Sequence, residues 1–201
     1  MKELTKKKGI ILTSKDYKEN ARLLTILTED GLENAILRGA NKINSKNKKF
    51  TIIPVEVEYV RTISTLATFT EGYITNNFIN LKLDQNKSLI YLAIVEKILA
   101  FTDSIDDKLQ MYEFVNKILT LLDQTKYPIV VLYLFEIKLL YLIGIAPILN
   151  SCVICHTSSD DCGFSLSLPG LLGRFLMGGY CDISLLHYAV GGVGDLVQQH
   201  G

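Results

Sequence analysis

The hydrophobic pattern of this chain changes its period near residues 76–86. Before that point, apolar residues come in short runs rich in β-branched types, and clusters of polar and turn-forming residues separate the runs. After it, apolar residues recur at three- and four-residue steps, as in LQMYEFVNKILTLL at residues 109–122, which is typical of amphipathic helices. Strands followed by helices predict an α+β protein.

The early apolar runs predict five strands. Alternation is clearest in the fourth run, where Val55, Val57 and Tyr59 would share one face of a strand and the glutamates between them the other face. Such a pattern suits a barrel or sandwich with one packed face and one wet face. The five runs are GIILTS, RLLTILT, LENAILR, FTIIPVEVEYV and LATFTEGYIT.

Two segments between the strands favour turns or loops. Asp30-Gly31 separates the second run from the third, and because Gly reaches positive φ without steric cost, these two runs are predicted to form a hairpin. Residues 39–49 (GANKINSKNKK) contain four lysines among small and polar residues. They predict a mobile basic loop.

The second part of the chain predicts at least three helices, enough for a small bundle. The last helix should end at Gly144, since Gly commonly caps a helix C-terminus. Residues 128–149 approach the length of a membrane span, but Glu136 and Lys138 lie in the middle, and each costs roughly 2.5–3.5 kcal/mol at a bilayer centre. A helix of a soluble bundle is the better interpretation. The predicted helices include residues 89–101, 109–122 and 129–143.

The formal net charge of zero conceals an asymmetry along the chain. Residues 1–62 contain 13 Lys or Arg and 8 Asp or Glu, whereas the remainder contains 8 and 13. The surplus suggests that the first segment meets a polyanion, although a solvated surface explains it equally well. The apolar stretch at the start is too short for a signal peptide, so we expect a cytosolic protein.

Motifs for covalent catalysis or phosphate transfer do not occur in the sequence. The three histidines, His156, His187 and His200, fall in no nucleophile motif. A Gly-x-x-x-x-Gly-Lys phosphate loop is also missing. The pair Asp106-Asp107 could serve a metal-dependent nuclease, but a solvated loop is favoured. We therefore expect a binding protein with no catalytic residues, not an enzyme.

Cys152 and Cys155 have the C-x-x-C spacing of half a structural zinc site. A zinc ribbon would show a second pair about 15 to 20 residues further on. The remaining cysteines, Cys162 and Cys181, are singly placed. Zn²⁺ held by Cys152 and Cys155 is one interpretation, and ordinary thiols in a reducing compartment are the other.

A five-stranded barrel of the OB type would be the natural platform for nucleic acid in the basic segment. Its aromatic residues are few, which favours contacts to the phosphate backbone with little sequence preference and a strong salt dependence. The candidate cations are Lys6, Lys7, Lys8, Lys15, Arg22, Arg38, Lys42, Lys46, Lys48 and Lys49.

Five short motifs follow one another early in the chain. They are Lys8-Gly9-Ile10-Ile11-Leu12, Asp16-Tyr17-Lys18-Glu19-Asn20, Arg22-Leu23-Leu24-Thr25, Thr28-Glu29-Asp30-Gly31 and Arg38-Gly39-Ala40-Asn41-Lys42. Their order and spacing resemble the N-terminal barrel of the RecO family, whose members read KGIVL, DYxEN, RLLT, TEDG and RGAxK. Residues 135–147 (FEIKLLYLIGIAP) and the C-x-x-C pair resemble the family's last long helix and the start of its cysteine-bearing insert, so the resemblance covers about residues 7–172.

The resemblance implies three domains and a departure at the end of the chain. Residues 1–78 would form the OB-type barrel, 79–150 the helical domain, and 151–201 a degenerate zinc-ribbon-like insert with an atypical ending. Many members continue with Gly-Gly-x-x-Cys-x-x-Cys, but Gly173 and Leu176 occupy the cysteine positions here. The chain also stops some tens of residues before a typical member would, so a truncated or frameshifted ending is our hypothesis.

The resemblance further implies a mediator of DNA repair and homologous recombination in the bacterial cytoplasm, associated with the nucleoid and not with a membrane. Such proteins bind single- and double-stranded DNA, anneal complementary strands, and work with RecR to load RecA onto strands coated by single-stranded DNA-binding protein, whose acidic, apolar tail they contact. A general single-stranded nucleic-acid-binding OB module is the alternative. Gly39 is expected to serve a backbone turn. The expected DNA contacts are Arg22, Arg38 and Lys42 in matched motifs, then Lys46, Lys48 and Lys49, with Lys6, Lys7 and Lys8 as further candidates.

Overall fold

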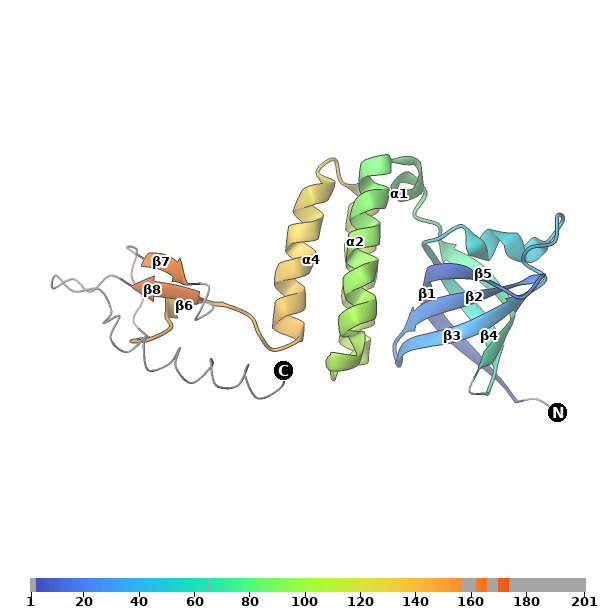
Figure 1. Cartoon of the computed structure of the whole chain (residues 1–201), viewed down its shortest axis with the longest axis horizontal. Helices are drawn as coiled ribbons and strands as arrows, with labels where there is room; N and C mark the ends of the chain where they lie inside the picture. The colour runs from blue at the N-terminus through green and yellow to red at the C-terminus, as the bar shows by residue number, and fades with distance from the viewer. Residues whose placement is uncertain (1–2, 65, 157–161, 166–169, 174–201) are drawn as a thin grey trace, which may run out of the picture. The chain divides into compact units, whose positions relative to one another are not determined.

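The computed structural model describes residues 3–64, 66–156, 162–165 and 170–173, and the chain divides into two compact units at Ile143 and Gly144. Within the described residues, the first unit consists of five strands followed by helices, and the second contains a three-stranded sheet (Figure 1). The α+β class and the order of strands before helices are therefore confirmed. The predicted domain boundaries at residues 78 and 150 stay predictions.

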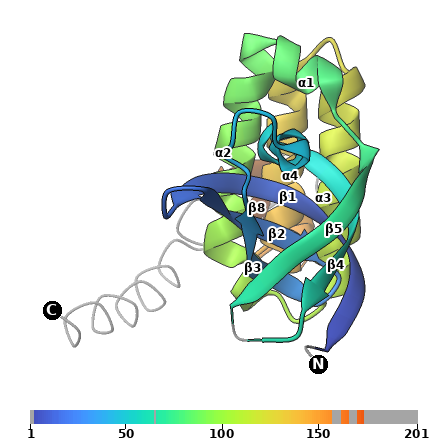
Figure 2. The same cartoon turned by 90° about the vertical axis from the view of Figure 1, so that its right-hand side faces the viewer.

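The five strands of the first unit pair into a closed ladder. β1 pairs antiparallel with both β2 and β4, and β2 forms the predicted hairpin with β3. A short parallel ladder of three residue pairs joins β3 to β5, and β5 pairs with β4, so the order β1-β2-β3-β5-β4 returns to β1 as a barrel (Figure 2). The strands are β1 (Leu4–Tyr17), β2 (Ala21–Thr28), β3 (Gly31–Arg38), β4 (Val55–Thr62) and β5 (Ala67–Asn76).

Alternation along β4 places three large side chains inside the barrel, as predicted. Val55, Val57 and Tyr59 are at most 1% exposed, and the ring of Tyr59 stacks on that of Phe69 with centroids 5.1 Å apart. Burial of this interior is the main stabilising contribution to the barrel. The rest of the interior cluster consists of Ile11, Leu24, Ile26, Ala35, Leu37, Ala40, Phe50 and Ala67.

The helices begin at capping residues that the sequence supplies. The Asp84 carboxylate accepts a hydrogen bond from the Lys87 amide at 3.1 Å, and Asp107 accepts one from the Gln110 amide at 2.8 Å. The last helix starts with Pro128 and is followed by Gly144 at φ 78°. In the described residues, none of these helices has the length and apolar character required to cross a membrane. They are α1 (Ile79–Leu83), α2 (Gln85–Phe101), α3 (Lys108–Gln124) and α4 (Pro128–Leu142), with a 3₁₀ turn η2 (Thr102–Ser104).

The outer face of the barrel shares a second core with the helices. Ile10, Leu12 and Leu27 lie in one apolar cluster with buried residues of α2, α3 and α4. A polar contact lies beside this core, because the Glu56 carboxylate, only 6% exposed, accepts hydrogen bonds from Tyr112 at 3.1 Å and from Asn116 at 3.0 Å. Barrel and helices therefore form one packed unit.

Two predicted boundaries were wrong. β1 begins at Leu4, well before the predicted start at residue 9, because the lysine-rich start pairs along the whole of β4. The predicted strand at residues 50–60 begins only at Val55, and residues Lys46–Thr51 instead form a 3₁₀ helix, η1. The predicted basic loop is therefore helical at its end.

The second unit pairs three short strands, β6 (Ile148–Cys152), β7 (Cys162–Ser165) and β8 (Gly170–Gly173), in the order β6-β8-β7. Among the residues that the structure describes, no three His, Cys, Asp or Glu side chains gather as metal ligands do. The degenerate zinc-ribbon assignment stays a prediction. The expected atypical ending, with Leu176 and Cys181, lies outside the described residues.

Candidate nucleic-acid interface

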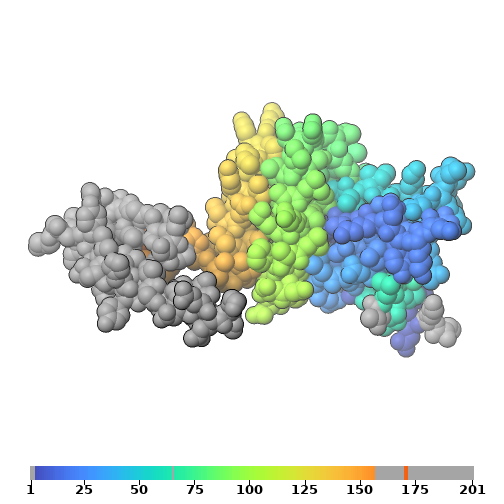
Figure 3. Space-filling model, in the orientation of Figure 1, coloured from blue at the N-terminus to red at the C-terminus, as the bar shows by residue number. Residues whose placement is uncertain are grey.

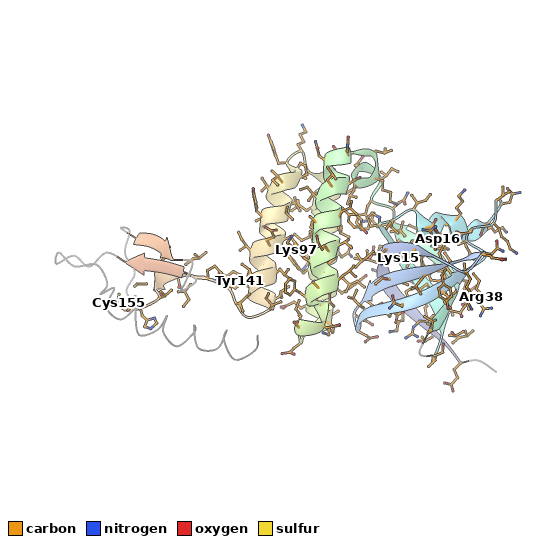
Figure 4. The ribbon with its side chains drawn as sticks, viewed as in Figure 1. Lys15, Asp16, Arg38, Lys97, Tyr141 and Cys155 are labelled. Carbon is orange, nitrogen blue, oxygen red and sulfur yellow. The ribbon has the colours of Figure 1, made fainter. Side chains whose placement is uncertain are left out.

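The candidate site is the end of the barrel where the β1–β2 turn meets the segment after β3. The ladders place Ala21 opposite both Tyr17 and Arg38, and the Asn41 side chain donates to the Asp16 carboxylate at 3.2 Å. Figure 4 shows Asp16 and Arg38 on this part of the barrel. We call this region the basic end, and its cations are Lys15, Lys18, Arg38, Lys42, Lys46, Lys48 and Lys49.

The cations of the basic end are all exposed. In the described part of the chain, no carboxylate lies within ion-pair distance of any of them. Lys18 and Lys49 instead lie over the rings of Tyr17 and Phe50, 5.4 Å and 4.8 Å from the ring centroids. A concentrated positive field of this kind attracts phosphate groups.

The segment between β3 and η1 is built from consecutive turns. Gly39 adopts φ 69°, which confirms the turn predicted for it, and its carbonyl accepts from the Lys42 amide at 3.3 Å. The Lys42 carbonyl accepts in turn from the Ser45 amide at 3.2 Å. Successive turns therefore position Lys42 at the surface on a defined backbone.

Two buried side chains and one side-chain hydrogen bond fix this segment to the barrel, and a second hydrogen bond caps η1 within it. Ala40 and Phe50 at its ends are both 2% exposed. The Asn47 side chain donates to the Arg38 carbonyl at 2.9 Å, and the Ser45 hydroxyl caps η1 by accepting from the Asn47 amide at 3.1 Å. The lysines of η1 are therefore held on a braced scaffold.

Three predicted contacts, Lys6, Lys7 and Lys8, lie elsewhere, on β1 beside β4. Each has a carboxylate partner, so little uncompensated charge remains there for a phosphate. Hydrogen bonds from Tyr73 and then Lys6 lower the pKa of Glu58, which keeps its carboxylate ionised. The ion pairs are Lys6 with Glu58 (2.9 Å), Lys7 with Asp30 (2.7 Å) and Glu33 (3.2 Å), and Lys8 with Glu56 (3.2 Å).

Arg22 directs its guanidinium at β1. Nε donates to the Ser14 hydroxyl at 2.8 Å, Nη2 to the Ser14 carbonyl at 2.7 Å, and Nη1 to the Asp16 carboxylate at 2.9 Å. This geometry cross-links the β1–β2 hairpin. The expected phosphate contact of Arg22 stays a prediction.

Sequence reasoning missed Lys18 and the group around Glu33. Lys18 lies in the β1–β2 turn at φ 56°, and its place in the second motif was the available signal. The Glu33 carboxylate accepts a hydrogen bond from the Tyr59 hydroxyl and pairs with Arg61 at 3.1 Å as well as with Lys7. Nothing in the spacing of these residues along the chain indicates that they meet.

The predicted metal ligands lie in the second unit. Cys152 ends β6 and is buried, and Cys155, labelled in Figure 4, lies in the turn that follows. The Cys152 carbonyl accepts from the His156 amide at 2.9 Å, and its sulfur accepts from the Ile154 amide at 3.5 Å. The C-x-x-C segment therefore forms a turn after β6, with the two-residue spacing that paired thiolate ligands of a structural zinc ion have.

Comparisons of the sequence with known proteins identify relatives of this chain. The chain is 26% identical over 171 residues to the DNA repair protein RecO of Bacillus subtilis (strain 168), in a match covering 84% of this chain and 67% of that protein. It is 24% identical over 169 residues to the DNA repair protein RecO of Halalkalibacterium halodurans, covering 83% of this chain and 66% of that protein. It is 23% identical over 171 residues to the DNA repair protein RecO of Listeria monocytogenes serotype 4b.

This chain spans about two thirds of the length of these relatives. A family model described as Recombination protein O N terminal matches residues 1–78, and one described as Recombination protein O C terminal matches residues 83–183. The first match contains the whole barrel and the second begins at the helices. The chain therefore belongs to the recombination protein O family, a family of DNA repair and recombination proteins.

Proposed function

We propose that this chain is a recombination mediator whose basic end binds the phosphate backbones of single- and double-stranded DNA. Its barrel is then of the OB type, with the ligand held at one end by lysine and arginine side chains. The observation that carries the proposal is the set of exposed cations without carboxylate partners on one braced segment. That set is Arg38, Lys42, Lys46, Lys48 and Lys49.

The physical step at this surface is neutralisation of phosphate charge. Each phosphate that meets a lysine or arginine releases condensed counterions, so affinity falls as salt rises. A surface that neutralises two strands together lowers their repulsion, which supports annealing of complementary strands. No bond-making step is involved, and the Asp107 carboxylate that a nuclease would need caps α3 instead.

The mediator proposal includes protein partners. RecR and the apolar, acidic tail of single-stranded DNA-binding protein are the partners that would bring RecA onto a coated strand. For the tail, support comes from α4, whose Tyr133, Leu134, Ile137 and Tyr141 are each about half exposed beside the exposed Lys138. An apolar patch flanked by a cation suits an acidic, apolar peptide.

We further propose that Cys152 and Cys155 can hold Zn²⁺, a role separate from DNA binding. A structural zinc ion takes four protein ligands, and these two cysteines would supply two of them. Metal analysis of the purified protein, with and without Cys155→Ser, tests whether this half site binds zinc.

The test is binding and annealing of short complementary DNA strands across a salt series. Replacing the five cations of the basic end with Ala should flatten the salt slope of single-strand binding by about 3.5, at roughly 0.7 for each phosphate contact. A control replaces Lys117 and Lys126, which are exposed on the helical part, with Ala and should leave the slope unchanged. An unchanged slope in the first variant contradicts the assignment of the basic end.

Annealing of coated strands separates the mediator from its alternative. A mediator speeds annealing of strands covered by single-stranded DNA-binding protein and binds RecR. A general single-stranded nucleic-acid-binding module does neither, although it shows the same salt slope. If this chain binds DNA but does not speed annealing of coated strands, the general module is favoured.

A further inference from the structure

Ile43 is the most exposed large apolar side chain in the described part of the protein, at 91%. A single exposed apolar residue needs no explanation on its own. Ile43 differs in its surroundings, since it follows Lys42 within the basic end and precedes Lys46 by three residues. Ile43 therefore lies in the same turn segment as lysines that are proposed to bind DNA.

The turn from Lys42 to Ser45 places Ile43 at its first central position. The Ser45 amide donates to the Lys42 carbonyl at 3.2 Å across this turn. Turns favour Gly, Pro, Asn, Asp and Ser, so a β-branched apolar residue is not what the backbone alone would select here. Figure 3 shows the segment around residues 39–51 standing out from the barrel surface. The backbone thus presents Ile43 outward.

The charges around Ile43 identify the chemistry of its partner. Once Lys42 and Lys46 hold phosphates of a strand, the bases between those phosphates are the apolar surface within reach. Aliphatic side chains of this size act as wedges in other DNA-binding proteins, where they insert between adjacent bases and unstack them. Every base presents a flat π-face, so a contact with that face does not depend on the sequence of the strand.

We propose that Ile43 inserts between neighbouring bases of the bound DNA strand and interrupts their stacking. This inference rests on the proposed function and specifies which part of the DNA the same surface contacts besides the phosphates. The lysines supply affinity for the backbone, and Ile43 supplies a contact that only bases can make. A strand held in this way presents unstacked bases for pairing with a complementary strand.

The experiment uses a single strand that carries one 2-aminopurine, a base whose fluorescence rises when it is unstacked. The full-length protein should raise this fluorescence at saturation. Ile43→Ser should abolish most of the rise and weaken binding about three- to ten-fold, with the salt slope unchanged. Ile43→Leu should retain the rise. Ile52→Ser is the matched control, because Ile52 is 58% exposed in the same segment, and it should behave as the unchanged protein does.

Two outcomes overturn the inference. Equal fluorescence in the unchanged protein and in Ile43→Ser, with intact salt-dependent binding, shows that Ile43 does not contact bases. Loss of binding to vesicles of an anionic phospholipid in Ile43→Ser, with the DNA signal unchanged, assigns the side chain to a membrane surface. Absence of DNA binding in every variant refutes the proposed function itself, which distinguishes the two failures.

Discussion

The hydroxyl of Tyr91 in α2 donates a hydrogen bond at 2.6 Å to the carbonyl oxygen of Leu12 in β1. Leu12 lies at an irregularity of the β1–β2 ladder, between Ile11 and Thr13, and it has no register partner in β2 or β4. Both residues are buried, and burial raises the pKa of Tyr91, so the hydroxyl remains a donor. A helix side chain therefore satisfies a carbonyl that the barrel leaves without a strand partner.

Removing this hydroxyl should destabilise the first unit. Tyr91→Phe leaves the buried Leu12 carbonyl without a donor, and we expect the free energy of unfolding to fall by about 1–3 kcal/mol. Urea denaturation followed by circular dichroism measures the change. Tyr133→Phe on the exposed side of α4 is the control and should change stability by no more than about 0.5 kcal/mol. Equal effects of the two substitutions would show that the Tyr91 bond contributes nothing.

A second prediction concerns Gly9, in the first family motif. A Cβ at this position would lie 2.9 Å from the Leu27 carbonyl oxygen and 2.7 Å from the Ile26 side chain. Because a backbone oxygen cannot rotate away, Gly9→Ala should cost about 1–3 kcal/mol through overpacking. A Cβ at Gly144 would have no atom within 4 Å, so Gly144→Ala should lower the free energy of unfolding only by the roughly 1–2 kcal/mol that a non-glycine residue costs at positive φ. Thermal unfolding that ranks Gly144→Ala as clearly worse than Gly9→Ala contradicts this account.

Substitution of Arg22 should lower stability, whereas substitution of Arg38 should weaken DNA binding. Arg22→Gln removes donors to Ser14 and Asp16, so we expect a loss of about 1–2 kcal/mol in unfolding free energy and a small effect on the salt slope. Arg38→Gln removes an exposed side chain and should reduce the slope by about 0.7 with stability unchanged. Fluorescence anisotropy of labelled single strands gives both slopes. The reverse pattern would assign a phosphate contact to Arg22.

Hydrophobic pattern located the five strands of the barrel and the helices α2, α3 and α4, but not all of their ends, and it indicated neither α1 nor the strands β6, β7 and β8. The β1 strand could not be extended backward through Lys6, Lys7 and Lys8, because a run of charges disfavours a strand unless a partner strand supplies opposite charges. Here Glu56 and Glu58 of β4 supply them. Those pairings depend on the register of β1 and β4, which no local pattern fixes.

The sequence predicted which segment of the candidate site is basic, but it did not predict which of the candidate cations belong to that site. Residues 39–49 were recognised as basic, and the structure places their lysines at one surface. Sequence alone could not separate cations with carboxylate partners, such as Lys7, from exposed ones, such as Lys46, because that distinction depends on residues distant in the chain. Lys18 was missed because the β1–β2 turn lies beside the segment after β3 only once β2 has paired with both β1 and β3.

Half-burial lowers the pKa of Lys82 to about 8, while attraction to Asp123 opposes that shift. In the unfolded chain the pKa returns toward 10.5, so between these two values the unfolded chain binds more protons than the folded one. The free energy of unfolding of the unchanged protein should therefore rise with pH across this window when it is compared with that of Lys82→Gln. Below the window, the difference between the two proteins should be constant. Urea denaturation of both proteins from pH 7 to about pH 10.5 measures it. Comparing the two proteins at each pH cancels the titration of tyrosines, so a flat difference would mean that Lys82 remains fully hydrated in the folded protein.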